Sequence, residues 1–154
     1  MKYLILPILL IFFSCNTNQE SKENNSKSNS SIDIPCSTDV CIEMINLNSK
    51  NKTFEIIMKN NVIVAGFQLD IIGAEIIEVK GGILEKRGFD VSNNTKRVLA
   101  FSMSGKTIDL GSNMMSVIKY GNQKEDEICL DGIVFAGQGG AKLSVNEPKC
   151  LKIK

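Results

Sequence analysis

The residues of this 154-residue chain that could do the most distinctive chemistry are its five cysteines: Cys15, Cys36, Cys41, Cys129 and Cys150. A thiol can act as a nucleophile, ligate a metal, form a disulfide or carry a lipid. The chain has no histidine, so neither a Cys–His nor a Ser–His pair can be assembled for nucleophilic catalysis. The C-x-x-C spacing that usually holds zinc is also missing. We therefore expect lipid attachment and disulfide bonds.

Cys15 ends an amino-terminal segment with the pattern of a secretory leader. Lys2 supplies a positive charge, and the run from Tyr3 to Phe13 is apolar apart from Pro7. Such a run is typical of a signal peptide and is short for a bilayer-spanning helix. A small residue followed by Cys15 resembles a bacterial lipobox, which predicts cleavage before Cys15 and lipid attachment to its thiol. The alternatives are an ordinary signal peptide or an uncleaved anchor.

The segment after Cys15 fits a membrane tether. Residues 16–31 carry no apolar side chain, so this stretch is expected to be disordered. A flexible chain of this length reaches roughly 20–25 Å. We expect a signal peptide over 1–14, a lipidated cysteine with its tether over 15–35, and one folded domain over 36–154. The protein would lie outside the cytoplasm in the cell envelope, bound to a membrane through its lipid.

Lipid attachment to Cys15 leaves four cysteines for the folded domain. An even number in an exported protein favours two disulfides. We favour Cys36–Cys41, which closes a small loop, and Cys129–Cys150, which would join the last two strands. The alternative pairs Cys36 or Cys41 with Cys150, which would tie the first strand to the last.

The charge pattern argues against several functions. Eighteen basic and seventeen acidic residues give a net charge of +1, whereas nucleic-acid binding needs a basic stripe. The densest acidic run, 125–127, reads as a solvated turn, so we expect no catalytic residues and no enzyme. Asp90, Asn93 and Asn94 offer oxygen ligands for calcium, but asparagine-rich turns are common without metal. No metal or cofactor is expected.

The elements that must position these residues are predicted to be β-strands throughout. Short runs rich in β-branched and aromatic residues alternate with glycine- and asparagine-rich turn signals, and no stretch combines a helical period with caps. Short strands at this spacing are typical of a β-sandwich. Ile83 to Lys86 and Gly88 to Val91 are among the predicted strands.

Alternation along the predicted strands assigns side chains to the core or to solvent. Phe67, Leu69 and Ile71 should point inward, with Gln68 and Asp70 outward. In the strand near residue 100, the larger side chains Leu99, Phe101 and Met103 should be core, which leaves Ala100 and Ser102 outside. Further core residues are predicted to be Phe54, Ile56, Phe89, Val117, Ile133 and Phe135.

Three segments together resemble a known family. They are VAGFQLDIIGAEIIEVKGG, RVLAFSMSGKTIDLGSNMMSVIKY and CLDGIVFAGQGGAKLSVNEPKCLKI. Their order and spacing, from Cys41 to Ile153, resemble cohesin-like domains. The resemblance implies an all-β fold, a single jelly-roll β-sandwich of about nine strands, of the kind shared with several carbohydrate-binding modules.

The resemblance also implies a function. Cohesins present one sheet face to a dockerin, a small helical module on a partner protein. The matching face would include Gln68, Asp70, Asp90, Ala100 and Ser102, on a non-catalytic docking or scaffolding module for polysaccharide-related assembly. One alternative is a carbohydrate-binding module. The chain has no tryptophan and one tyrosine beyond the leader, which disfavours a flat aromatic platform but permits a polar groove for soluble glycans. Another alternative is a structural envelope lipoprotein.

Overall fold

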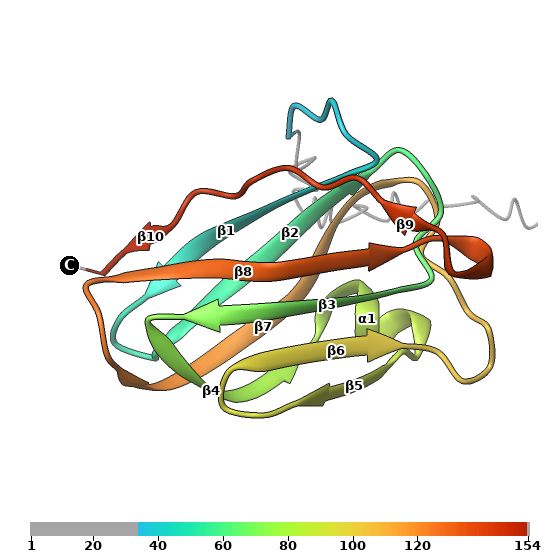
Figure 1. Ribbon diagram of the computed structural model, residues 1–154. Helices are drawn as coiled ribbons and strands as arrows, with labels where there is room; N and C mark the ends of the chain where they lie inside the picture. Colours follow the sequence, from blue (N-terminus) through green and yellow to red (C-terminus); the bar gives the residue numbers. More distant parts are fainter. Residues whose placement is uncertain (1–33, 154) are drawn as a thin grey trace, which may run out of the picture.

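The computed structural model describes residues 34–153 and folds them into two packed β-sheets (Figure 1). The predicted signal peptide, the lipid site at Cys15 and nearly all of the predicted tether lie outside the described residues. The all-β prediction is confirmed. Residues 34–153 contain ten strands instead of about nine, and two of them are only two residues long.

The back sheet contains four strands in the order β1-β2-β7-β4. They are β1 (Val40–Asn48), β2 (Thr53–Asn60), β7 (Gly111–Gln123) and β4 (Ala74–Lys80). The front sheet has the order β10-β8-β3-β6-β5, and β9 also pairs with β8. Its strands are β10 (Leu151–Lys152), β8 (Glu127–Ala136), β3 (Gly66–Ile72), β6 (Arg97–Phe101), β5 (Asp90–Asn93) and β9 (Lys142–Leu143).

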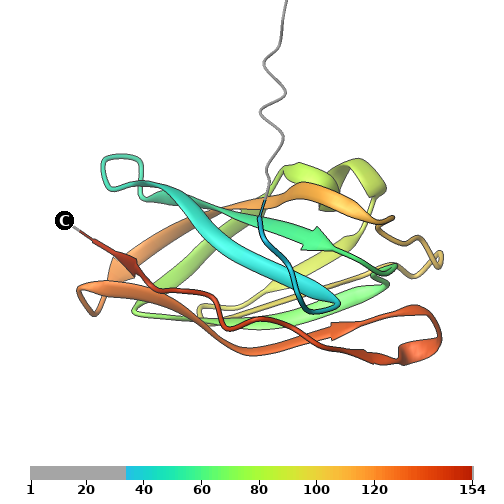
Figure 2. The same cartoon turned by 90° about the horizontal axis from the view of Figure 1, so that it is seen from above.

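The chain crosses between the two sheets after β2, β3, β4, β6 and β7. Repeated crossing of this kind is typical of jelly-roll sandwiches. A 3₁₀ turn, η1 (Gln138–Gly140), leads into β9. The segment between β9 and β10, residues 144–150, is called the closing segment. It runs beside β1, with a parallel bridge between Val40 and Val145. Figure 2 shows this segment passing along one side of the sandwich.

The core lies between the sheets and is built from alternating inward-facing residues. Phe67 stacks on Phe135 with ring centroids 5.2 Å apart, and their strands are paired in register at these residues. The predicted inward positions of β3 are confirmed. Of the further core predictions, Phe54, Ile56, Phe89 and Phe135 are buried. Val117 and Ile133 are only partly buried.

The predicted faces of β6 are wrong. Ala100 is fully buried, whereas Leu99, Phe101 and Met103 are exposed. The register explains the reversal, because Ala100 is paired with Phe67, whose ring already fills the interior beside Phe135. A small side chain is what fits there. Since side chains alternate along a strand, burial of Ala100 turns both larger neighbours outward.

The strand predicted over Ile83 to Lys86 is also wrong, because these residues belong to helix α1 (Gly82–Arg87). The helix ends at Gly88, whose φ of 64° is left-handed and whose N–H donates to Glu85 O at 2.9 Å. This is a common helix stop signal. At the other end Gly82 lies against β7, and a Cβ there would be 2.2 Å from Met115 O. Glycine is therefore required where the helix meets the sheet.

The described part of the chain contains two disulfides, Cys36–Cys41 and Cys129–Cys150. This is the favoured connectivity of the sequence analysis. Disulfides form and persist in oxidising compartments, so both bonds indicate a protein that folds outside the cytoplasm. Among residues 34–153, no helix is long and apolar enough to cross a bilayer.

Candidate docking face

The outer face of the front sheet carries exposed apolar side chains at its centre. Leu99 and Phe101 of β6 are 40% and 37% exposed, and Val134 of β8 is 42% exposed. Gln68 of β3 is paired with both Leu99 and Val134, so these three side chains lie side by side across three strands. The interior of a sandwich normally takes such residues, and contiguous exposed apolar residues make this face the candidate contact surface.

Between these side chains lies a shallow apolar groove of about 320 Å³. Its outward-facing residues are Gly66, Gln68, Leu99, Phe101, Val134 and Ala136. Gly66 keeps the floor flat, because a Cβ at this position would be 2.9 Å from Ala100 O and 3.4 Å from the Cβ of Phe101. The apolar groove is therefore open to a partner that contacts the sheet closely.

Charged residues close one end of the apolar groove. Arg97 donates two hydrogen bonds to Asp70, at 2.6 Å and 3.0 Å, and Lys96 lies 3.6 Å from the same carboxylate. The hydrogen bonds from Arg97 hold the pKa of Asp70 below its ordinary value, although burial opposes this shift. Asp70 lies on the outer face as predicted, but it is only 5% exposed. Arg97 and Lys96 therefore present the accessible charge.

The other end of the apolar groove carries Asp90, which is paired in register with Phe101. Its carboxylate accepts a hydrogen bond from the N–H of Met103 at 3.2 Å. Ser102 lies in the loop after β6, where its hydroxyl accepts from the N–H of Lys106 at 3.2 Å. The two ends of the groove thus differ in charge.

The structure brings together only part of the predicted docking set. Gln68 and Asp90 lie on the outer face and are accessible, and Asp70 lies there beneath Arg97. Ala100 points into the core, which contradicts its predicted position. The sequence analysis missed Leu99, Phe101 and Val134. The signal for Leu99 and Phe101 lay in the alternation of β6. Its sequence allows burial either of Val98 and Ala100 or of Leu99 and Phe101.

The other candidate sites do not form ligand clusters. Asp90 and Asn93 stand at opposite ends of β5, and Asn94 Oδ1 accepts hydrogen bonds from the backbone of the following turn. Glu127 lies near Cys129 and Cys150. The two sulfur atoms are bonded to each other, so they are not thiolate ligands for a metal.

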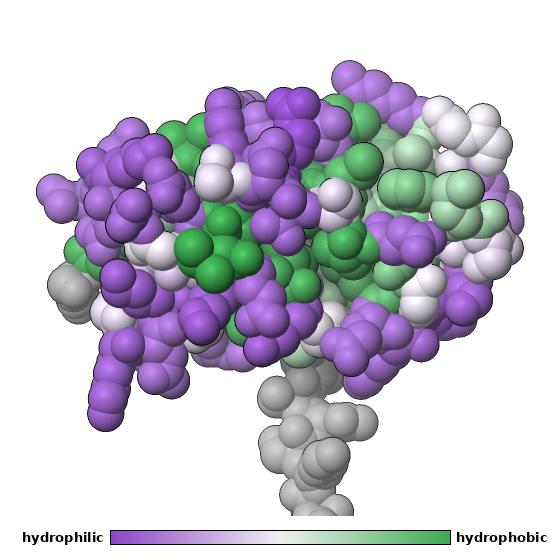
Figure 3. All heavy atoms as spheres, turned by 90° about the horizontal axis from the view of Figure 1, so that it is seen from below, coloured by the Kyte–Doolittle hydropathy of each residue, from purple (hydrophilic) through white to green (hydrophobic). Residues whose placement is uncertain are grey.

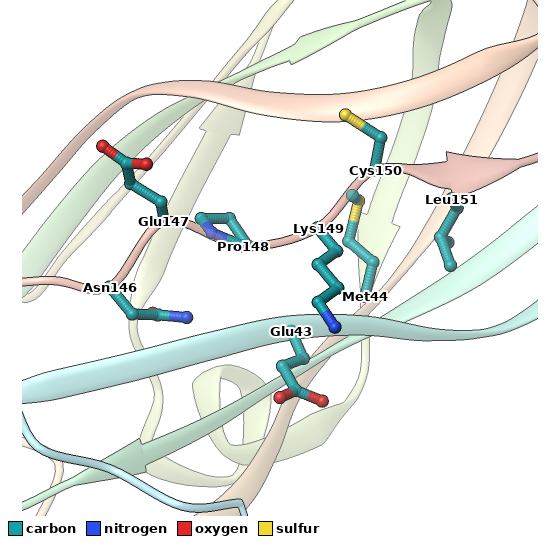
Figure 4. Close-up of a pocket in the computed structure, with 8 residues that line it drawn as sticks. All are labelled: Glu43, Met44, Asn146, Glu147, Pro148, Lys149, Cys150 and Leu151. Carbon is teal, nitrogen blue, oxygen red and sulfur yellow. The ribbon is translucent and has the colours of Figure 1, made fainter.

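A separate polar pocket of about 380 Å³ lies between β1 and the closing segment. Figure 4 labels Glu43, Asn146 and Lys149 among the side chains around it. Asn146 accepts from the N–H of Ile42 at 2.7 Å and donates to its carbonyl at 3.1 Å. Both polar atoms of its amide are therefore hydrogen-bonded to the backbone of β1, so the side chain has a structural role there.

The protein is therefore a disulfide-bonded β-sandwich with an apolar groove on the outer face of its front sheet. No family model and no curated protein matches the chain. Among solved structures, it is similar to a non-cellulosomal cohesin from the hyperthermophilic archaeon Archaeoglobus fulgidus, with 16% identity over 77% of this chain and 92% of that one, at a TM-score of 0.49. It is also similar to a chain in the crystal structure of a CaDoc0917–CaCohA2 complex, with 10% identity over 75% of this chain and 99% of that one, at a TM-score of 0.41.

Proposed function

We propose that this protein is a non-catalytic docking module whose apolar groove binds a helical, dockerin-like module on a partner protein. The observation that carries the proposal is the exposure of Leu99, Phe101 and Val134 at the centre of the front sheet. Burial of exposed apolar surface drives association, at roughly 25 cal/mol per Å² of apolar area removed from water. Residues at the centre of an interface usually dominate its energy.

The shape and charge of the groove favour a helix as its occupant. The floor at Gly66 and Ala136 lacks large side chains, so an apolar helix stripe can lie between Leu99, Phe101 and Val134. Arg97 and Lys96 at one end suit acidic residues of the partner, and Asp90 at the other end suits a basic residue. The resemblance of the sequence to cohesin-like domains points to the same kind of partner.

We also propose that the module is tethered to the outside of the cell through lipid on Cys15. The leader, the cysteine and the polar tract 16–31 support this assignment. Two or more acyl chains give stable anchoring where one does not. A tethered docking module would hold its partner at the cell surface, where polysaccharide-related assembly is one setting for it.

The test uses isothermal titration calorimetry of the purified protein against a panel of purified dockerin modules. We expect at least one module to bind, and Leu99→Asp or Phe101→Asp to weaken that binding at least tenfold, because a carboxylate would be buried in an apolar contact. The matched control is Ile77→Asp, since Ile77 is an exposed apolar residue, 57% accessible, on the back sheet. That variant should bind as the native protein does.

Two results would contradict the proposal. One is that no dockerin module binds. The other is that Ile77→Asp weakens binding as much as Leu99→Asp, which would place the interface elsewhere. Binding on a glycan array, together with silence toward the dockerin panel, would favour the carbohydrate-binding alternative.

A further inference from the structure

A second site lies on the underside of the sandwich, away from the apolar groove. There β4 and β5 are edge strands of the two sheets, and both lie along the lower side of the molecule (Figure 1). Figure 3 views this underside and shows hydrophobic residues reaching the surface between hydrophilic ones. An edge pocket of about 290 Å³ lies here, lined by Val79, Lys80, Leu84, Phe89, Val91 and Ser116 among others. This volume is close to the lower end of the range for small-molecule sites.

The walls of the edge pocket are apolar and come from different elements. Val79 belongs to β4, Leu84 to α1 and Val91 to β5, while Phe89 connects α1 to β5. Leu84 and Phe89 are buried in the core, and Val79 and Val91 are partly buried against it. The pocket is therefore an extension of the hydrophobic core that remains open to solvent.

Ser116 places one polar group among these apolar walls. It is paired with Ile56, a core residue, and is itself only 2% exposed. Its hydroxyl has no hydrogen-bond partner within residues 34–153. Within residues 34–153, Asn60 Oδ1 is the only side-chain polar atom that is both inaccessible to solvent and without a hydrogen-bond partner. The Ser116 hydroxyl is therefore not sealed, and solvent reaches it through the pocket.

The charges at the mouth of the edge pocket are already partnered. Lys80 pairs with Glu78 at 2.9 Å, and Glu85 accepts a hydrogen bond from the N–H of Gly81 at 2.8 Å. A charged ligand would lose hydration among the apolar walls without gaining a free counter-ion. A neutral ligand would not incur that loss.

We propose that the edge pocket binds a small uncharged, mainly apolar molecule that carries one hydrogen-bonding group, and that this group pairs with the Ser116 hydroxyl. The apolar body of the ligand replaces water against Val79, Leu84, Phe89 and Val91. A buried hydroxyl that lacks a partner is costly, so a ligand that supplies one is favoured over an equally sized hydrocarbon. This site is independent of the docking function.

The test compares p-cresol with toluene, which differ by one hydroxyl group. Each is titrated into the ¹³C-methyl-labelled protein up to its solubility, and methyl shifts are followed by NMR. We expect shifts at Val79, Leu84 and Val91, and about five- to tenfold tighter binding of p-cresol than of toluene, because one hydrogen bond is added. Ser116→Ala should remove this preference. The control Ser102→Ala, which removes a hydroxyl from the loop after β6, should keep it.

Several outcomes would overturn the proposal. They are the absence of methyl shifts, shifts confined to Leu99 and Val134 of the apolar groove, and equal affinity of the native protein for both probes. Persistence of the preference in Ser116→Ala would do so as well. Val91→Phe provides a second variant, because the larger side chain fills the edge pocket from an edge strand. It should abolish binding of both probes, and undiminished binding would contradict the location of the site.

Discussion

At the scale of single residues, the most consequential ion pair is Asp70–Arg97 on the outer face of the front sheet. Two hydrogen bonds hold the guanidinium and the carboxylate together, and Lys96 adds a second cation. The pKa of Asp70 is lowered from 3.8, chiefly by Arg97. A carboxyl whose pKa is lower in the folded state stabilises the protein above pH 3.8, and this contribution is lost as pH falls through the lowered pKa.

We predict that Arg97→Met flattens the acid side of the stability profile. Urea unfolding at about pH 6 and at about pH 2 should show a smaller loss of unfolding free energy in the variant than in the native protein, because the pKa shift of Asp70 is reduced. Lys152→Met is the control, since Lys152 is an exposed cation that lies 3.8 Å from Glu127. Identical acid losses in the native protein and Arg97→Met would contradict the role assigned to Arg97.

At the scale of elements, the closing segment acts as a partial strand on β1. Val40 donates to Ser144 O at 3.0 Å, and Asn146 N donates back to Val40 O at 3.3 Å. Two residues further along β1, the Asn146 side chain supplies both hydrogen bonds to Ile42 that a neighbouring strand would supply. A side chain thus ends the pairing that the backbone begins.

We predict that Asn146→Ala lowers the free energy of unfolding by about 1–3 kcal/mol, because it leaves the N–H and carbonyl of buried Ile42 without these partners. Urea denaturation measures the loss, and faster amide hydrogen exchange at Ile42 locates it. Glu147→Ala changes the exposed neighbour and should stay within about 0.5 kcal/mol of the native protein. An unchanged exchange rate at Ile42 would show that the amide is not the relevant contact.

The success of prediction also differs between elements. A long strand such as β8 (Glu127–Ala136) can be recognised from its own sequence, because β-branched residues and flanking turn signals identify it locally. The faces of β6 were not, since Arg97–Phe101 alternates two apolar sets and the choice is made by Phe67 on the neighbouring strand. Helix α1 was missed because six residues are too few to show a helical period. Gly88 ends the helix, but glycine is equally a signal for a turn.

The candidate site was predictable only in part for the same reason. Gln68 follows from alternation along its own strand, and Asp90 was assigned by the resemblance, whereas the exposure of Leu99 depends on packing between the sheets. The choice of the larger side chains as core is reasonable, because their burial removes more apolar area from water. Its failure at Leu99 and Phe101 is what reveals the apolar groove.

At the scale of the whole molecule, the sequence predicts an anchor at Cys15 that the polar tract 16–31 separates from the folded domain. We predict that Cys15→Ser releases the protein from the membrane fraction, because the acyl chains provide the attachment. Mass spectrometry of the intact native protein should find the lipid on Cys15. If Cys15→Ser still sediments with membranes after a high-salt wash, the anchor must lie elsewhere in the chain.

The described chain begins beside the back sheet, whereas the apolar groove lies on the outer face of the front sheet (Figure 2). If the protein is anchored through Cys15 as we propose, its attachment point and its groove would lie on different sides of the sandwich. A partner would approach without first passing between the protein and the lipid headgroups. A tether of the predicted length would have a limited radius. Captured partners would then be confined to a thin layer above the membrane, where neighbouring copies could engage the same partner at a raised local concentration.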